Sequence, residues 1–113
     1  MGAWGVNIFD DDFALDLKEE YSEVLDSGLS HEVATKALTE RYKDALEDPE
    51  ESSVFWLALA SIQLEHDALV NHVKANALGV INSNRDLLRW EDSPDANQRK
   101  QILEQLKNQL LQN

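Results

Sequence analysis

Residues 48–65, DPEESSVFWLALASIQLE, indicate the architecture most directly, because this segment is apolar on nearly every side of a helix. Its apolar side chains are Val54, Phe55, Trp56, Leu57, Leu59, Ile62 and Leu64. Asp48 can cap the helix, Pro49 suits its first position, and Glu51 stands where a capping box has its second member. A helix that is apolar all round is buried between other elements. We therefore predict a helix over residues 49–65 at the centre of the fold.

Other segments with helical apolar periodicity flank this one on both sides. They are residues 11–26, about 31–46, about 67–82 and about 94–111. Their apolar positions are Phe13, Ala14, Leu17, Tyr21, Val24 and Leu25, then Val33, Ala34, Ala37, Leu38, Tyr42 and Ala45, then Leu69, Val73, Ala77, Val80 and Ile81, and finally Ile102, Leu103, Leu106 and Leu110. Asp10 or Asp11 is expected to cap the first helix, and Gly28 to end it. Ser30 is expected to cap the second helix, and Ser93 with Pro94 to begin the last.

The stretch between the fourth and last helices is less regular. Asn82, Ser83 and Asn84 indicate a break, although a helix bent near Gly79 is an alternative. Residues 85–90, RDLLRW, are predicted to form a short helical turn that places Leu87, Leu88 and Trp90 in the core. No segment has the period of two that is typical of a strand. The expected fold is therefore all-α, a compact bundle of about five helices in a single domain over residues 1–113.

The chain begins with an arm, MGAWGVNIFDDDFALD, residues 1–16. We expect Trp4 and Phe9 to insert into the helical core, with Gly5 permitting a tight turn between them and Phe9 acting in a hydrophobic staple. Asp11 is expected to start the first helix, so that Trp4, Gly5, Phe9 and Asp11 are structural anchors. The adjacent acids of this arm lack the alternate spacing and central glycine of a calcium loop.

Acidic side chains outnumber basic ones by 22 to 10, and the net charge is −12. Residues 1–50 hold 14 acidic and 4 basic side chains, a net of −10, whereas residues 51–113 hold 8 and 6, a net of −2. Such a surface repels nucleic acids and anionic membranes and attracts basic proteins. The longest apolar run, VFWLALA, is too short to cross a membrane. With no cysteine and no signal-peptide pattern, the expected location is cytoplasmic.

Signatures of catalysis are missing from the sequence. No serine stands in a nucleophile elbow, and the four glycines are scattered rather than clustered as a phosphate loop requires. His66 and His72 are six residues apart, which on one straight helix points them in different directions, and His31 is remote from both in sequence. We therefore expect no metal, no cofactor and no enzymatic activity.

The arm resembles the start of a family of small uncharacterised bacterial proteins that begin MGxWGxGxFxNDxAxD. The matching residues are Trp4, Gly5, Phe9, Asp11, Ala14 and Asp16. Trp90, a proline, Arg99 and the leucine-rich final helix resemble the end of the family's sequences, while Asn7, Ile8 and Asp10 depart from its pattern. The family has no established activity, but some members lie near polymorphic toxin systems. The resemblance thus implies immunity to a toxin as one function.

The leading functional hypothesis is a non-enzymatic protein-binding module, with toxin immunity as its most concrete form. An acidic face from residues 10–50 would dock over a basic active site of another protein. The candidate residues are Asp16, Glu19, Glu20, Glu23, Glu40 and Asp44. One alternative is a small ligand-binding or enzymatic domain with a pocket at Trp4, Asp11 and Asp12, which would take a cation. Another is a DNA mimic that inhibits a DNA-binding protein.

Overall fold

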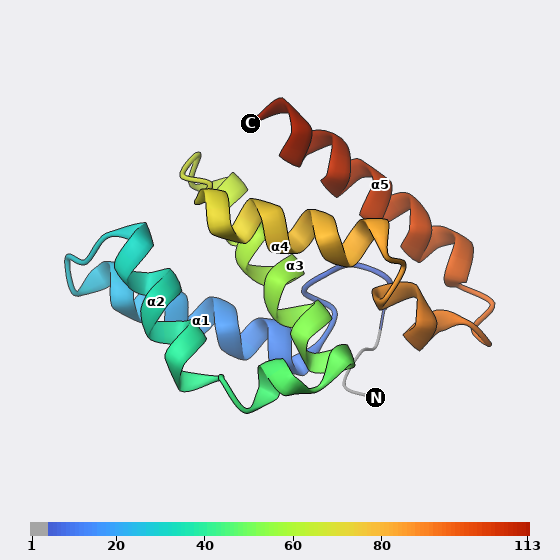
Figure 1. Ribbon diagram of the computed structural model, residues 1–113, viewed down its shortest axis with the longest axis horizontal. Helices are drawn as coiled ribbons and strands as arrows, with labels where there is room; N and C mark the ends of the chain where they lie inside the picture. The colour runs from blue at the N-terminus through green and yellow to red at the C-terminus, as the bar shows by residue number, and fades with distance from the viewer. Residues whose placement is uncertain (1–4) are drawn as a thin grey trace.

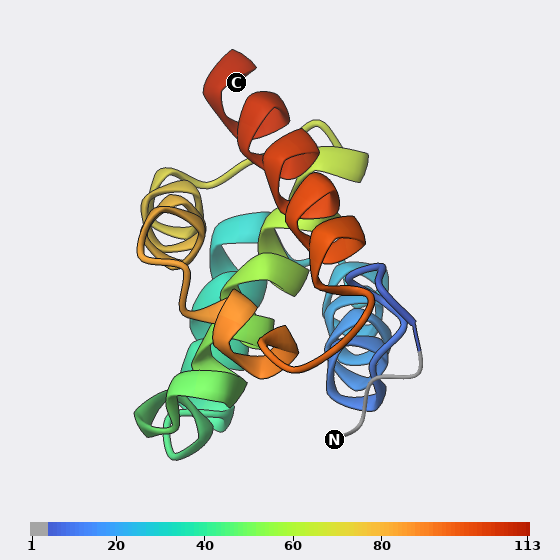
Figure 2. The same ribbon diagram turned by 90° about the vertical axis from the view of Figure 1, so that its right-hand side faces the viewer.

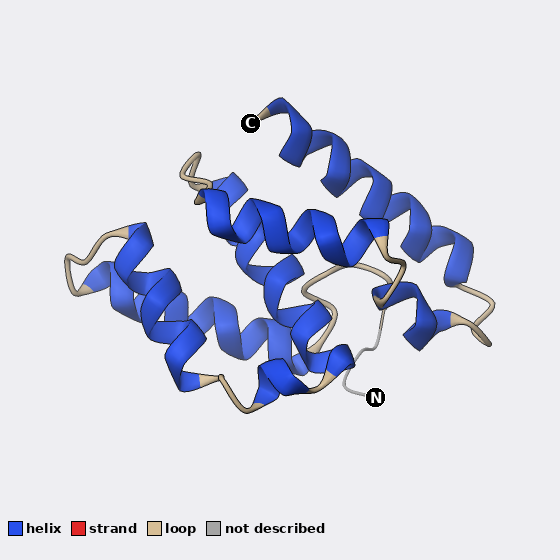
Figure 3. Ribbon diagram, in the orientation of Figure 1, coloured by secondary structure: helices blue, strands red, loops and turns tan. Residues whose placement is uncertain are grey.

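The computed structural model describes residues 5–113 and is all-α, as the sequence predicts (Figure 1). Its elements are α1 (Asp12–Asp26), α2 (His31–Arg41), the 3₁₀ helix η1 (Ala45–Glu47), α3 (Pro49–Glu65), α4 (Asn71–Asn82), the 3₁₀ helix η2 (Asp86–Trp90) and α5 (Ala96–Gln112). No strand occurs among the described residues (Figure 3). α1 and α2 form a hairpin on one side of α3, and α4 with α5 covers the other (Figures 1 and 2).

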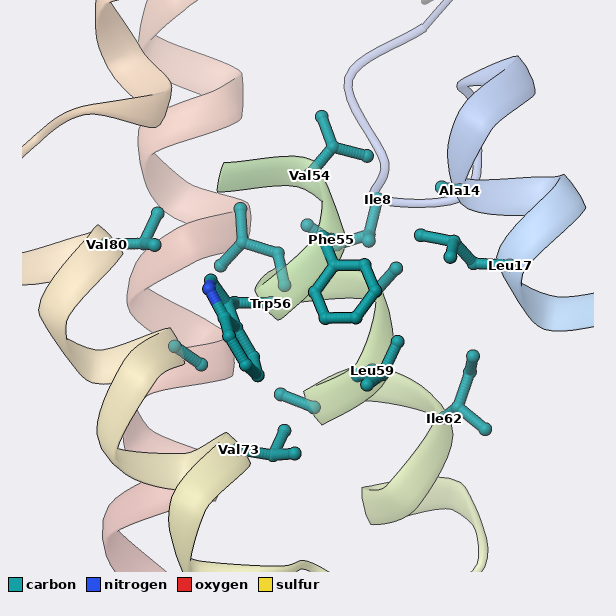
Figure 4. Close-up of a cluster of buried hydrophobic side chains, with 14 of the residues drawn as sticks. Ile8, Ala14, Leu17, Val54, Phe55, Trp56, Leu59, Ile62, Val73 and Val80 are labelled. Carbon is teal, nitrogen blue, oxygen red and sulfur yellow. The ribbon is translucent and has the colours of Figure 1, made fainter. Parts of the chain in front are cut away.

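α3 is the central helix, as its sequence predicts, and it contacts α1, α4, α5 and both 3₁₀ helices. Residues 52–60 are all buried. Phe55 points toward α1 and the arm, whereas the ring of Trp56 points toward α4 (Figure 4). Asp48 caps the helix by accepting hydrogen bonds from the backbone N–H groups of residues 50 and 51 at 2.8 and 3.4 Å. The expected capping box is not formed, because the Asp48 N–H donates to the carbonyl oxygen of Ala45 instead.

The start of α1 settles the choice between two capping residues in favour of Asp11. Its carboxylate accepts a hydrogen bond from the backbone N–H of Ala14 at 3.1 Å. Asp10 instead accepts hydrogen bonds from the backbone and side-chain N–H groups of Asn7. At the other end Gly28 has φ of +87°, a left-handed conformation that favours glycine and ends the helix as predicted.

α2 differs from its prediction in length and in orientation. It ends at Arg41 rather than near residue 46, and residues 45–47 form η1. The residue before a proline is held in extended backbone, so a turn must separate α2 from α3. Val33 and Ala37 of the predicted apolar stripe are exposed, and Thr35 is buried instead. α2 packs mainly on α1, which covers only one narrow side of it.

α4 begins four residues later than predicted because a buried side chain holds the preceding loop. The side-chain Oε1 atom of Gln63 accepts a hydrogen bond from the Val70 N–H at 2.9 Å. The backbone carbonyl oxygen of Gln63 accepts one from the Ala68 N–H. Asp67 takes a left-handed conformation with φ of +52°. The helix then runs through Gly79 and ends at residue 82, which confirms the break predicted at Asn82, Ser83 and Asn84. α5 likewise begins two residues later than expected.

The same Gln63 amide joins three helices through buried polar contacts. Its Nε2 donates to the Tyr21 hydroxyl at 3.2 Å and to the Thr35 hydroxyl at 2.8 Å. The Thr35 hydroxyl in turn donates to the carbonyl oxygen of His31 at 2.8 Å. Every donor and acceptor of the buried amide group is thereby used, which removes the cost of burying it. These bonds tie α1 and α2 to α3.

η2 confirms the predicted helical turn but not all of the expected side-chain positions. Trp90 is buried and Leu87 is half-buried. The predicted core position of Leu88 is wrong, because this residue is 67% exposed. The inward position is taken by Asp86, which is fully buried. An acidic residue is inward here because two arginines are available to pair with it.

The buried Asp86 carboxylate organises one end of the molecule. Arg99 donates to both of its oxygens, from Nε at 2.7 Å and from a terminal nitrogen at 2.9 Å. Arg89 donates to Asp86 at 3.3 Å and to Asp11 at 3.1 Å. The remaining terminal nitrogen of Arg99 donates to the carbonyl oxygen of Val6 at 2.9 Å. This ion-pair network, which we call the Asp86 network, joins the arm, the start of α1, η2 and α5.

The arm packs differently from the prediction. Ile8 enters the core, whereas Phe9 is partly buried, with the Lys18 ammonium 4.8 Å from its ring centre. The predicted staple is wrong, because the residue before the Asp11 cap is Asp10 and not Phe9. A Cβ on Gly5 would lie 2.9 Å from the Cγ atom of Asp10, so a larger residue at this position would displace the Asp10 side chain. Trp4 lies outside the described residues.

Removing the buried carboxylate should destabilise the fold. Asp86→Ala leaves the guanidinium of Arg99 buried without its partner, and breaking a buried pair in this way costs about 3–5 kcal/mol. We expect urea unfolding followed by circular dichroism to show a loss of this size. Asp92→Ala, which removes an exposed carboxylate nearby, should change stability by less than about 0.5 kcal/mol. Equal stabilities of the two variants would contradict a structural role for Asp86.

Candidate protein-binding site

The outward side of α1 carries an acidic stripe. Ala14, Leu17 and Tyr21 are buried on its inner side. The acids on the opposite side, all exposed, are Asp12, Asp16, Glu19, Glu23 and Asp26, whereas Glu20 is half-buried. Like charges three or four residues apart on a helix destabilise it by about 0.2–0.5 kcal/mol per pair. Lys18, the one basic residue of α1, lies 3.9 Å from Glu65 of α3.

The six predicted residues fall into two groups. Asp16, Glu19, Glu23 and Asp44 are exposed and form no ion pair within residues 5–113. Glu20 is half-buried, where it accepts a hydrogen bond from the Tyr42 hydroxyl and pairs with Arg41 at 3.0 Å. Glu40 lies 3.8 Å from Lys43. The first group therefore presents unneutralised charge, while Glu20 also holds α1 against the end of α2.

A groove of about 490 Å³ lies between α1 and α2, and we call it the α1/α2 groove. It is lined by Glu20, Glu23, Val24, Ser27, Leu29, Ala37, Leu38, Glu40 and Arg41. The structure thus brings Glu20, Glu23 and Glu40 together around one apolar depression. Asp16 lies elsewhere, and Glu19 and Asp44 are not in the lining. Sequence reasoning missed Leu29, although it stands four residues before Val33 and eight before Ala37 on one helical line.

A second groove, of about 390 Å³, bears on the hypothesis of a pocket near the arm. Its lining consists of Asp11, Asp12, Phe13, Asp16, Glu50, Glu51, Val54 and Arg89, and we call it the α1/α3 groove. Five carboxylates surround this groove, and the guanidinium of Arg89 in its lining is already paired with Asp11 and Asp86. Asp11 and Asp12 therefore do line a hollow, as that hypothesis requires, while Trp4 lies outside the part of the chain described.

The histidines form packing contacts. His31 is half-buried with its Nδ1 2.7 Å from the Tyr21 hydroxyl, and its ring centre is 5.3 Å from that of His66. His72 packs edge to face against Trp56, with 5.3 Å between the two ring centres. Burial raises the pKa of Tyr21, and the charge of Glu32 adds to this, so its hydroxyl stays protonated and can donate to His31. Across residues 5–113 no three histidine, aspartate or glutamate side chains group as metal ligands.

These features define an acidic, all-helical protein with two charged grooves on its α1 side. The chain belongs to a protein family: residues 2–113 match the model of a domain of unknown function, DUF4259. The expected membership of an uncharacterised family is thereby confirmed. No curated protein and no solved structure matches the chain. None of the helices described is both long enough and apolar enough to span a bilayer.

Stability should fall in strongly alkaline solution because of Tyr42. Burial, the hydrogen bond to Glu20 and the negative charge of that carboxylate together raise the pKa of Tyr42 to about 12. The ordinary tyrosine value is about 10. Because the folded state holds the proton more tightly, this contribution to stability is complete below pH 10 and is lost as the pH rises toward 12.

Tyr42→Phe should therefore lose less stability than the wild type between pH 10 and 12. Urea unfolding followed by circular dichroism at several pH values in this range measures the difference. Both proteins retain Tyr21, whose pKa is also raised, so its contribution cancels in the comparison. Identical losses in the two proteins would show that Tyr42 does not titrate differently on folding.

Proposed function

We propose that this protein is a non-enzymatic binding module whose acidic face on α1 and α2 engages a basic surface of another protein. The observation that carries the proposal is the exposure of Asp16, Glu19 and Glu23 along one helix without ion-pair partners in the described chain. Such a concentration of like charge disfavours the isolated helix. A basic partner would remove that repulsion on binding.

The mechanism would be occlusion guided by charge. α1 has 15 residues and is about 22 Å long, so its acids extend over a surface comparable with one side of a small interface. Charge complementarity accelerates encounter and disfavours acidic competitors. In its most concrete form the partner is a toxin with a basic active site, as the resemblance of the arm implies. A DNA mimic would use the same face against a DNA-binding protein.

Reversing the unpaired acids of α1 should abolish this recognition. We expect a variant with Asp16→Lys, Glu19→Lys and Glu23→Lys to bind its partner at least about tenfold more weakly. Binding of the wild type should also weaken as salt rises, because exposed charges are screened. The partner is captured from host lysate on the immobilised protein and identified by mass spectrometry. Its affinity for both proteins is then measured by calorimetry.

A matched control places the same charge change away from the proposed face. Glu91, Asp92 and Asp95 are exposed in the segment between η2 and α5, and reversing all three to lysine changes the net charge equally. This variant should retain most of the affinity. An affinity that does not change with salt concentration, or that falls equally in both triple variants, would overturn the proposal.

A cationic small ligand in the α1/α3 groove is the second candidate function. The observation that favours it is the placement of five carboxylates around one hollow of about 390 Å³ beside Phe13. Its volume lies in the usual range for ligand sites. An aromatic ring beside carboxylates suits an organic cation.

Spermidine provides the test of this candidate. We expect calorimetry to detect saturable binding that falls at least about fivefold when Glu50→Gln and Glu51→Gln remove two of the lining charges. Glu91→Gln with Asp92→Asn removes two exposed charges elsewhere and should leave binding unchanged. Absence of saturable binding, or an equal loss in the two variants, would exclude a cation site in this groove.

A further inference from the structure

α2 exposes more apolar surface than its own fold covers. Leu29 is 49% exposed and Val33 is 43% exposed, and Ala37 is exposed as well. These residues are spaced at intervals of four, so they line up along one side of the helix and the residue that precedes its cap. Ala34 and Leu38 form a separate line that faces the core. The helix therefore has two apolar sides, of which the fold uses one.

The uncovered side borders the α1/α2 groove. Leu29 and Ala37 belong to the lining of that groove, and Val24 adds a half-buried apolar side chain from α1. The two helices lie side by side with their ends joined by a short turn (Figures 1 and 2). The result is a shallow depression with an apolar floor that lies along the hairpin.

The rim of the groove is acidic. Glu20, Glu23 and Glu40 lie around it, against the single cation Arg41. Arg41 is paired with Glu20 at 3.0 Å, so two carboxylates of the rim remain for a partner, one of which also lies near Lys43. An apolar floor between carboxylates complements a segment that is apolar on one side and basic on its flanks.

We propose that the α1/α2 groove docks an amphipathic helix of the partner protein, with apolar anchors on one side and lysine or arginine beside them. This inference rests on the proposed function and specifies its partner. Residues 29–37 extend about 12 Å, which two to three turns of a docked helix would cover. Recognition would follow the helix-in-groove mode, with anchors at i, i+3 or i+4, and i+7.

Other occupants fit the groove less well. A second copy of the chain related by two-fold symmetry would bring two acidic rims together, which repel each other. Anionic lipid is repelled for the same reason. A peptide that binds by adding a strand needs a free strand edge, and residues 5–113 contain no strand. A helix with one apolar side and basic flanks complements both the apolar floor and the acidic rim of the groove.

The probe is a synthetic helical peptide made of leucine and lysine, with leucines at i, i+3, i+4 and i+7. Calorimetry should show binding to the wild type, at least about tenfold weaker binding of a peptide of the same composition with its leucines scrambled, and no binding when glutamate replaces lysine. Nuclear magnetic resonance should place the largest amide shifts at Leu29, Val33 and Ala37.

Substitutions in the protein locate the contact. Leu29→Ser together with Val33→Ser should weaken peptide binding at least about tenfold, because both are exposed apolar side chains that the peptide would cover. Leu88→Ser with Leu111→Ser removes two exposed leucines elsewhere and should leave affinity unchanged. Circular dichroism and unfolding of each variant show whether the fold is retained.

The outcomes separate this inference from the proposed function. If the peptide binds in a salt-dependent manner and the triple reversal on α1 abolishes binding, but the groove variant binds normally, the acidic face stands and the groove is excluded. If the captured natural partner binds the triple-reversal variant as tightly as the wild type, the proposed function itself fails. A stable dimer in light scattering that the groove variant converts to monomer would assign the groove to a second copy and overturn the inference.

Discussion

The pairing of the Asp86 carboxylate with Arg99 is the contact on which one half of the structure depends. A carboxylate without exposure to water is costly unless it is paired and hydrogen-bonded, and here both oxygens accept bonds from guanidinium groups. Arg99 then reaches the arm through the carbonyl oxygen of Val6, and Arg89 reaches the cap of α1 through Asp11. Segments from both ends of the described chain are therefore fixed by one buried charge.

This network also gives a physical meaning to the residues that carry the resemblance of the arm and of Trp90 to a known family. Asp11 caps α1 and accepts the bond from Arg89, while Trp90 lies with its ring 5.4 Å from the guanidinium carbon of Arg99. Gly5 lies so close to Asp10 that a side chain at this position would displace the Asp10 carboxylate. These residues hold the fold together, so the resemblance that they carry is explained by the fold and implies no particular activity. The proposed function is sought instead on α1 and α2, away from the Asp86 network.

Much of the fold was predictable because local signals and apolar periodicity agree. Asp48 with Pro49, Ser30 and Gly28 mark helix boundaries by capping chemistry, which acts within one turn. The start of α4 was predicted too early because the buried Gln63 side chain binds the backbone of the preceding loop at Val70, a contact that apolar periodicity does not report. The negative charge of α1 was predictable from the amino-acid composition of this segment. Its division into free carboxylates and a paired Glu20 was not, because Arg41 and Tyr42 approach Glu20 only through the packing of the hairpin.

The sequence by itself determined an all-α fold with residues 49–65 at its centre, since a helix that is apolar all round has no stable position at a surface. It also determined the excess of negative charge in the first half of the chain. Only the tertiary structure decided which apolar residues are covered: α2 has two apolar sides, and α1 covers one while Leu29 and Val33 remain exposed. Periodicity reports which residues share a side of a helix, but the neighbouring elements decide which side is buried.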